Sequence, residues 1–244
     1  MDMKRTAQLN SLDLSGNNLQ RLEDDVFEDL VNLKELNISM NPITEIMGRH
    51  FQPLYQLEVL SMHDLPSLLQ LPNPSEYSHL ANLRSLIMYN LANATLKYNI
   101  THILQHLPPL RSLYIELRDP VFDSQLHDVD MTHMRQLTIT GKSITNISST
   151  AVHALRGYKV HLSLINTSLQ DFPNSLFTTL GGVYFLTLSL PFNEIRRIQP
   201  FKNTVQPWIN QHGEPYSVRL LYGLADRMDS IINDQSAPSR ASLL

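Results

Sequence analysis

The amino-acid sequence predicts an α/β repeat solenoid, in which each coil of the chain adds one short strand to a parallel sheet. The first observation is the abundance of leucine, which fills 41 of the 244 positions. The second is that the leucines recur in one phase along the chain, and the third is that this phase returns every 24 to 27 residues. Self-similarity at such a regular period is typical of chains whose coils stack on one another.

Two segments, Leu9 to Leu19 and Leu33 to Ile43, fit the pattern L-x-x-L-x-L-x-x-N-x-L, with an aliphatic residue at every apolar place. A third segment, Phe185 to Ile195, departs only at the first place. The spacing lies within the range of roughly 20 to 29 residues that leucine-rich repeats occupy. We therefore predict a leucine-rich-repeat solenoid over residues 1–201, a horseshoe with a concave parallel β-sheet and a mostly irregular or short-helical convex side. Including looser copies, its eight repeats start near Leu9, Leu33, Leu57, Leu83, Leu110, Met134, Lys159 and Phe185.

An asparagine follows the strand in the three best repeats, at Asn17, Asn41 and Asn193. An amide side chain in that turn can bond the backbone of the neighbouring coil. The middle repeats lack this asparagine and carry, for example, Leu65 and Leu91 instead. We therefore expect the central coils to be less regular than the outer ones.

The leucine phase is lost after residue 201, so residues 202–244 are predicted to form a cap-like segment with a short helix and a frayed tail. The helix is expected behind Ser217, because apolar residues recur there at near-helical spacing. Covering the open end of the solenoid is one role for this helix, and binding a partner is the alternative. The apolar residues that suggest it are Val218, Leu221, Ala225, Met228 and Ile232.

Composition excludes several classes of function. The net charge of -4 argues against nucleic acid as a partner, and no apolar run has the roughly 18 residues that a membrane helix needs. The chain has no cysteine. Gly141-Lys142-Ser143 lacks the earlier glycine of a phosphate-binding loop, and His102 with His106 lacks a third metal ligand. We therefore predict no catalytic residues, no cofactor and no metal site. A solvated acidic face is expected where Asp123, His127, Asp128, Asp130 and His133 cluster.

The run from Leu12 to Leu19, followed by Phe27, Leu30 and Leu33, resembles the typical class of leucine-rich repeats of extracellular proteins. The proline-bearing segment 65–68 is loosely similar to arthropod cell-surface proteins of the chaoptin and artichoke kind. The resemblance implies a non-catalytic protein-binding, cell-adhesion or receptor-ectodomain module at the cell surface or outside the cell. Because cysteine-rich caps and a signal sequence are missing, we expect a segment of a larger protein or an incomplete gene product. The alternative is a cytoplasmic scaffold or adaptor.

Five N-x-[ST] sequons offer candidate glycosylation sites, which favours the extracellular interpretation. Five sequons are a mild excess over the number expected by chance, so the alternative at each site is that the asparagine carries no glycan. The sequons begin at Asn37, Asn93, Asn99, Asn146 and Asn166.

A candidate partner surface follows from the third, fifth and seventh places of each repeat, which should face solvent. The first and last repeats carry small residues there, whereas the third to fifth carry aromatic and charged ones. Adjacent strands lie about 4.8 Å apart, so these side chains should form one patch. Its partner would be another protein or a second copy of the chain; alternatively, the tyrosines merely cover the sheet. The predicted partner-binding residues are His63, Asp64, Ile87, Tyr89, Tyr114 and Glu116.

Overall fold

The computed structural model describes residues 8–92, 99–171, 173–178, 180, 182–196 and 217–221. The chain divides into two compact units. Unit 1 comprises Met1–Glu116 with Asp128–His133, and unit 2 comprises Leu117–His127 with Met134–Leu244. Each unit is built from coils of a leucine-rich-repeat solenoid with a parallel sheet, as the sequence predicts.

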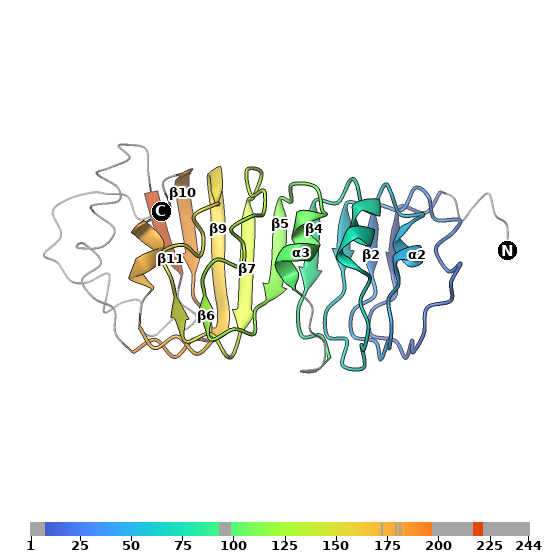
Figure 1. Cartoon of the computed structure of the whole chain (residues 1–244), viewed down its shortest axis with the longest axis horizontal. Helices are drawn as coiled ribbons and strands as arrows, with labels where there is room; N and C mark the ends of the chain where they lie inside the picture. Colours follow the sequence, from blue (N-terminus) through green and yellow to red (C-terminus); the bar gives the residue numbers. More distant parts are fainter. Residues whose placement is uncertain are drawn as a thin grey trace, which may run out of the picture. The chain divides into compact units, whose positions relative to one another are not determined.

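Unit 1 contains five neighbouring parallel strands, one from each coil (Figure 1). Their register pairs Leu12 with Leu36, Leu36 with Leu60, Leu60 with Leu86, and Leu86 with Leu113. These leucines hold the same place of the repeat pattern, and from Leu36 onward they are buried. The repeat spacing therefore sets the register. The strands are β1 (Ser11–Asp13), β2 (Glu35–Asn37), β3 (Val59–Ser61), β4 (Ser85–Met88) and β5 (Ser112–Glu116).

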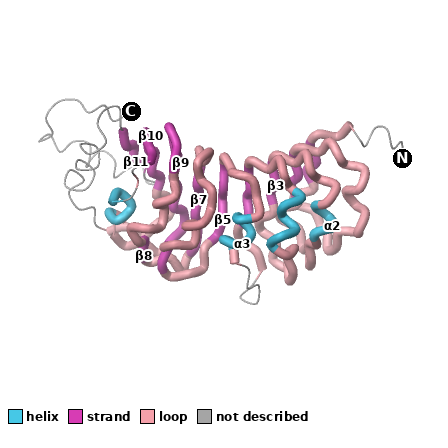
Figure 2. Tube along the Cα trace, turned by 45° about the horizontal axis from the view of Figure 1, so that its top comes forward, coloured by secondary structure: helices cyan, strands magenta, loops and turns pink. Residues whose placement is uncertain are grey.

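Within the described residues, the returning segments of unit 1 carry the short helices α2 (Gly48–Phe51), the 3₁₀ helix η1 (Pro74–His79) and α3 (Ile100–Gln105). Figure 2 shows how short these helices are compared with the loops around them. They contribute large apolar side chains to the core, and Phe51 packs against Tyr77 with ring centroids 5.4 Å apart. Such aromatic pairs add about 0.5–1.5 kcal/mol beyond the area that they bury.

Asparagine side chains join neighbouring coils, as the sequence predicts. Asn41 is only 1% exposed. Its Nδ2 donates to the carbonyl oxygen of Leu14 in the preceding coil (2.8 Å), and its Oδ1 accepts from the Leu19 N–H (3.1 Å). Asn193 makes the equivalent bond in unit 2, where its Nδ2 donates to the Leu164 oxygen (2.8 Å). The asparagines thus supply hydrogen bonds to backbone groups of the preceding coil.

In the coils where leucine replaces the asparagine, backbone N–H and C=O groups of neighbouring coils form hydrogen bonds with each other. Leu65 and Leu91 are both buried and form an isolated parallel bridge. The Leu65 N–H donates to the Asn90 oxygen (3.2 Å), and the Ala92 N–H donates to the Leu65 oxygen (2.9 Å). A leucine is therefore tolerated at this place in these coils.

The residue that precedes the asparagine or leucine of this turn adopts a left-handed conformation in four coils of unit 1. The φ angles are 66° at Gly16, 55° at Met40, 52° at Asp64 and 51° at Asn90. Glycine, asparagine and aspartate tolerate this conformation better than other residues do. The turn after each strand thus places residue 64 and residue 90 at equivalent positions.

Unit 2 contains β7 (Gln136–Gly141), β9 (Arg156–Thr167), β10 (Gly182–Ser189) and β11 (Ser217–Leu221) as neighbouring parallel strands (Figure 1). Again the register follows the repeat, pairing Leu137 with Leu162 and Leu162 with Leu188. A small parallel ribbon, β6 (Val121–Phe122) with β8 (Asn146–Ile147), and the 3₁₀ helix η2 (Asn174–Thr178) belong to the returning segments.

The helix predicted behind Ser217 is wrong for its first residues. Residues 217–221 form β11, which pairs in parallel with β10 through Leu186 opposite Val218 and Leu188 opposite Leu220. A short apolar run fits both helical and strand periods, and the exposed edge of β10 supplies hydrogen bonds that favour the strand. Ala225, Met228 and Ile232, like the predicted boundary between residues 201 and 202, lie outside the described residues.

Candidate functional site: an aromatic patch on unit 1

Three aromatic rings form a continuous stack across β3, β4 and β5. The His63 ring lies 4.7 Å from the Tyr89 ring with an interplanar angle of 4°, measured between centroids. Tyr89 in turn stacks on Tyr114 at 4.2 Å and 20°. All three side chains are half-buried. The stack exists because repeat spacing brings the fifth and seventh places of successive coils next to one another.

Two carboxylates lie beside this stack, and one asparagine holds both of them. Asp64 Oδ2 lies 2.8 Å from His63 Nδ1, and Asp64 Oδ1 accepts a hydrogen bond from Asn90 Nδ2. The backbone N–H of Asn90 donates to Glu116 Oε2 (3.1 Å). The carboxylates therefore have defined positions before any partner binds.

Asn90 is not among the residues predicted from the sequence. Its signal is the left-handed place that Asn90 shares with Gly16 and Asp64, since all three residue types tolerate positive φ. The sixth predicted residue, Ile87, is paired in register with Tyr114 on β5 and is half-buried. The structure therefore brings all six predicted residues together on unit 1. We call these six residues and Asn90 the aromatic patch.

The electrostatics keep the patch acidic at neutral pH. Partial burial raises the pKa of the Asp64 carboxyl, but hydrogen bonds from Asn90 and His63 lower it by more, so the net shift from 3.8 is downward. Burial raises the pKa of Tyr89, and the charge of Asp64 raises it further. The pKa of Tyr114 is raised by burial, by Tyr89 and by Asp64. Asp64 is therefore ionised and both phenols are neutral.

The lowered pKa of Asp64 predicts a pH-dependent contribution to stability. A carboxyl whose pKa is depressed on folding stabilises the fold above its unfolded value, and this contribution is lost as the pH falls through the folded value. We expect the stability difference between the wild type and Asp64→Asn to shrink as the pH falls from about 5 to about 2. Urea unfolding across this range measures it. A difference that stays constant with pH would contradict the assignment.

The sequons differ in exposure. Asn99, Asn146 and Asn166 are exposed, Asn37 is half-buried on the sheet face, and Asn93 lies outside the described residues. The side-chain oxygens of Asn37, Asn99 and Asn146 accept backbone N–H groups (3.1, 3.0 and 2.8 Å). Glycans attach to the amide nitrogen, which these bonds do not use.

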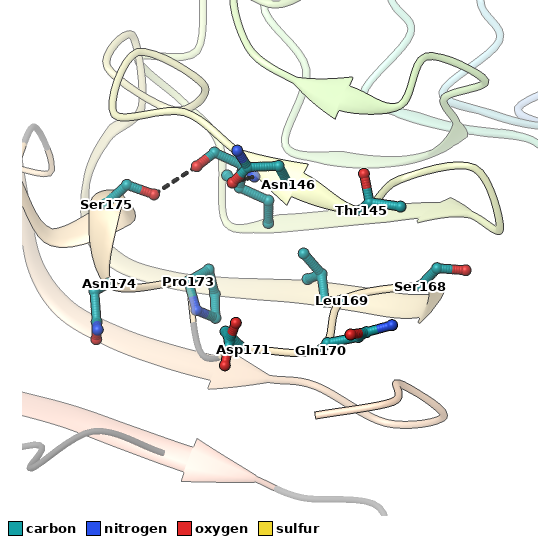
Figure 3. A pocket seen from close by; sticks show the side chains of 10 residues that line it. Thr145, Asn146, Ser168, Leu169, Gln170, Asp171, Pro173, Asn174 and Ser175 are labelled. Atoms are coloured by element: carbon teal, nitrogen blue, oxygen red, sulfur yellow. Dashed lines mark hydrogen bonds between the residues drawn. The ribbon is translucent and has the colours of Figure 1, made fainter. Parts of the chain in front are cut away.

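A second concave region lies in unit 2, among the returning segments around β8 and η2 (Figure 3). It is an open, largely polar hollow of about 470 Å³. Ser175 Oγ, at one side, donates to the Ile147 oxygen (2.6 Å), and Asn146 lies at the rim. Asp171 is the one ionisable side chain among the lining residues, so the hollow offers no acid–base pair.

The other side chains considered for metal or phosphate binding have local structural roles. His106 Nδ1 lies 2.8 Å from the His102 carbonyl oxygen, and Ser143 Oγ donates to the Arg118 oxygen (2.7 Å). Asp123 accepts hydrogen bonds from Ser148 and Thr150, which lower its pKa. In the part of the chain that the structure describes, no three His, Asp or Glu side chains are grouped to hold a metal. Nor does any described helix have the length and apolar character to cross a membrane.

Comparison with known proteins agrees with this architecture. A family model described as leucine rich repeat matches residues 7–65. Chaoptin of Drosophila melanogaster is 24% identical over 212 residues, which are 77% of this chain and 16% of chaoptin. The transforming growth factor beta activator LRRC33 of Danio rerio is 33% identical over 98 residues, 39% of this chain and 13% of that protein. The chain thus spans only a small part of the length of these relatives.

A solved structure shows the same fold. Human 5T4, also called Wnt-activated inhibitory factor 1 or trophoblast glycoprotein, superposes with a TM-score of 0.63 at 21% sequence identity. The match covers 87% of this chain and 79% of 5T4.

Proposed function

Because the chain is a leucine-rich-repeat solenoid that resembles chaoptin over 77% of its length, we propose that it is a non-catalytic recognition module. It binds another protein through the aromatic patch, in a cell-adhesion or receptor-ectodomain role within a larger protein. Recognition then depends on side chains presented by a rigid sheet, since each coil is held by its neighbours.

The observation that carries this proposal is the stack of His63, Tyr89 and Tyr114. Tyrosine is enriched among the residues that contribute most to binding at protein interfaces, and such residues cluster near the interface centre. The rings are already ordered by stacking on one another. A partner therefore loses little affinity to the ordering of side chains. Chaoptin, 5T4 and LRRC33 support the same role as cell-surface proteins, because their repeats resemble this chain.

The test is the double substitution Tyr89→Ala with Tyr114→Ala in the full chain. Partners are first identified by screening the tetramerised protein against an array of purified extracellular domains. Removing two central aromatic side chains should weaken binding of a true partner by about 100-fold or more. Surface plasmon resonance measures the change, and circular dichroism verifies the fold.

Tyr158→Ala with Tyr184→Ala provides the matched control. These tyrosines are 68% and 45% exposed, and their rings lie 6.0 Å apart in unit 2. The control should bind each partner as tightly as the wild type does. If the patch variant keeps its affinity, or if only the control loses it, the aromatic patch is not the binding surface.

We further infer that the chain is displayed outside the cell. When it is expressed in insect cells behind an added signal peptide, we expect Asn99, Asn146 and Asn166 to carry glycans because they are exposed. Intact mass before and after glycan removal measures occupancy, and Asn→Gln variants assign each site. A folded, secreted and unmodified chain would instead favour the intracellular scaffold.

A further inference from the structure

The sheet face of unit 1 is acidic. Its solvent-facing places are the third, fifth and seventh of the repeat and the left-handed place that follows. In the five coils from Leu9 to Glu116, these places hold Asp13, Glu35, Asp64 and Glu116 but no lysine or arginine. A face with carboxylates of one sign attracts a partner of the opposite sign.

Three basic residues of these coils, Lys34, Arg84 and Arg111, lie one place before β2, β4 and β5. Lys34 and Arg84 both pair with Glu58, at 3.4 and 3.1 Å between nitrogen and oxygen. The Glu58 carboxylate compensates one of these positive charges, and all three basic residues lie at the amino-terminal border of the sheet. The aromatic patch, which lies toward the carboxyl ends of the strands, keeps its acidic character.

From this geometry we propose that the partner of the aromatic patch is a basic protein surface that places an arginine side chain against the ring stack, between Asp64 and Glu116. The inference rests on the proposed function. A neutral tyrosine ring attracts a guanidinium group through its π face, and Tyr114, at the end of the stack, has one face that Tyr89 does not cover. The two carboxylates supply hydrogen-bond acceptors nearby. Arginine suits this site better than lysine because its planar group both stacks on rings and bonds carboxylates in a bidentate manner.

Preorganisation of the acceptors supports this choice. Asp64 is held by His63 and Asn90, and Asn90 also holds Glu116. The side chains of His63 and Asp64 are 19% and 35% exposed, so a partner can reach them, although each is partly shielded from water. Partial desolvation strengthens both cation–π and ionic contacts.

The experiment measures binding of three capped peptides, hexa-arginine, hexa-lysine and hexa-glutamate, to the full 244-residue chain by fluorescence anisotropy at low salt. We expect hexa-arginine to bind about fivefold more tightly than hexa-lysine, and hexa-glutamate not to bind. Tyr114→Leu should weaken hexa-arginine binding about fivefold, whereas Tyr114→Phe, which retains the ring, should not. Asp64→Asn should also weaken it.

Glu28→Gln is the matched control, because it removes one negative charge from an exposed returning segment of the same unit. Its affinity for hexa-arginine should match the wild type. If Glu28→Gln and Asp64→Asn weaken hexa-arginine binding equally, the binding comes from general charge attraction and the inference is overturned. Equal affinity for hexa-arginine and hexa-lysine, or full affinity in Tyr114→Leu, would overturn it as well.

The two proposals fail in different ways. Suppose that a partner from the array no longer binds the variant with Tyr89→Ala and Tyr114→Ala but binds the variant with Asp64→Asn and Glu116→Gln normally. The aromatic patch then remains the binding surface, and the proposal of a basic partner is contradicted. If a partner from the array binds the tyrosine double variant normally, the aromatic patch is not its binding surface.

Discussion

Replacing Asn41 with leucine should lower the free energy of unfolding by about 4 kcal/mol, the largest effect that we expect from a single polar side chain in unit 1. The Asn41 amide accepts a hydrogen bond from the Leu19 N–H of the preceding coil and donates to the buried Ile38 oxygen (3.1 Å), and it shares the Leu14 oxygen with Asn17. Each buried backbone group left without a partner costs about 1–3 kcal/mol. Urea unfolding followed by circular dichroism measures the change.

Leucine is the informative replacement because Leu65 and Leu91 occupy the same place in later coils. Their turns replace the amide with backbone hydrogen bonds, and the turn of Asn41 relies on the side chain. Asn17→Leu provides the control. Asn17 is exposed and donates to the Leu14 and Ser15 oxygens, so its replacement should cost less than about 1 kcal/mol. Equal losses in the two variants would show that burial of the amide is not the cause.

Gly141→Ala should destabilise the chain by about 3 kcal/mol, because the backbone packs too closely for a side chain. A Cβ atom at Gly141 would lie 2.0 Å from the backbone oxygen of Leu117 and 3.1 Å from Ile144 Cδ1. The Leu117 N–H is itself bonded to the Thr140 oxygen (2.8 Å), so the two segments cannot separate without losing this bond. Thermal unfolding measures the effect.

Gly16→Ala separates steric contact from backbone conformation. No atom lies within 4 Å of a Cβ built on Gly16, but its φ is 66°. Only the cost of a left-handed alanine remains there, about 1–2 kcal/mol. If Gly141→Ala cost no more than Gly16→Ala, the close approach at Leu117 would not limit the fold.

The neighbours that form the aromatic patch were predictable, but their stacking geometry was not. Because the side-chain period of a strand is two and the coils repeat at near-constant length, His63, Tyr89 and Tyr114 had to share a face. Their stacking depends on rotamers and on the local register, which no repeat pattern contains. The bridging role of Asn90 depends on a left-handed turn that places its amide beside Asp64.

The carboxyl-terminal segment shows the converse limit. Val218, Leu221 and Ala225 have helical spacing, whereas Val218 and Leu220 alternate as in a strand. Five residues cannot decide between these periods. The open edge of β10 decides it for residues 217–221, because pairing there satisfies backbone groups on both strands.

By itself, the sequence determined the repeat class, the register of the strands that carry the repeat leucines and the coupling of coils by Asn41 and Asn193, since each of these follows from local periodicity and residue chemistry. The tertiary structure decided the ring stack, the hydrogen bonds that hold Asp64 and Glu116, and the close approach of Gly141 to Leu117. Those features depend on the rotamers and close approach of atoms from different coils, 24 to 26 residues apart in the chain, which the repeat period alone does not specify.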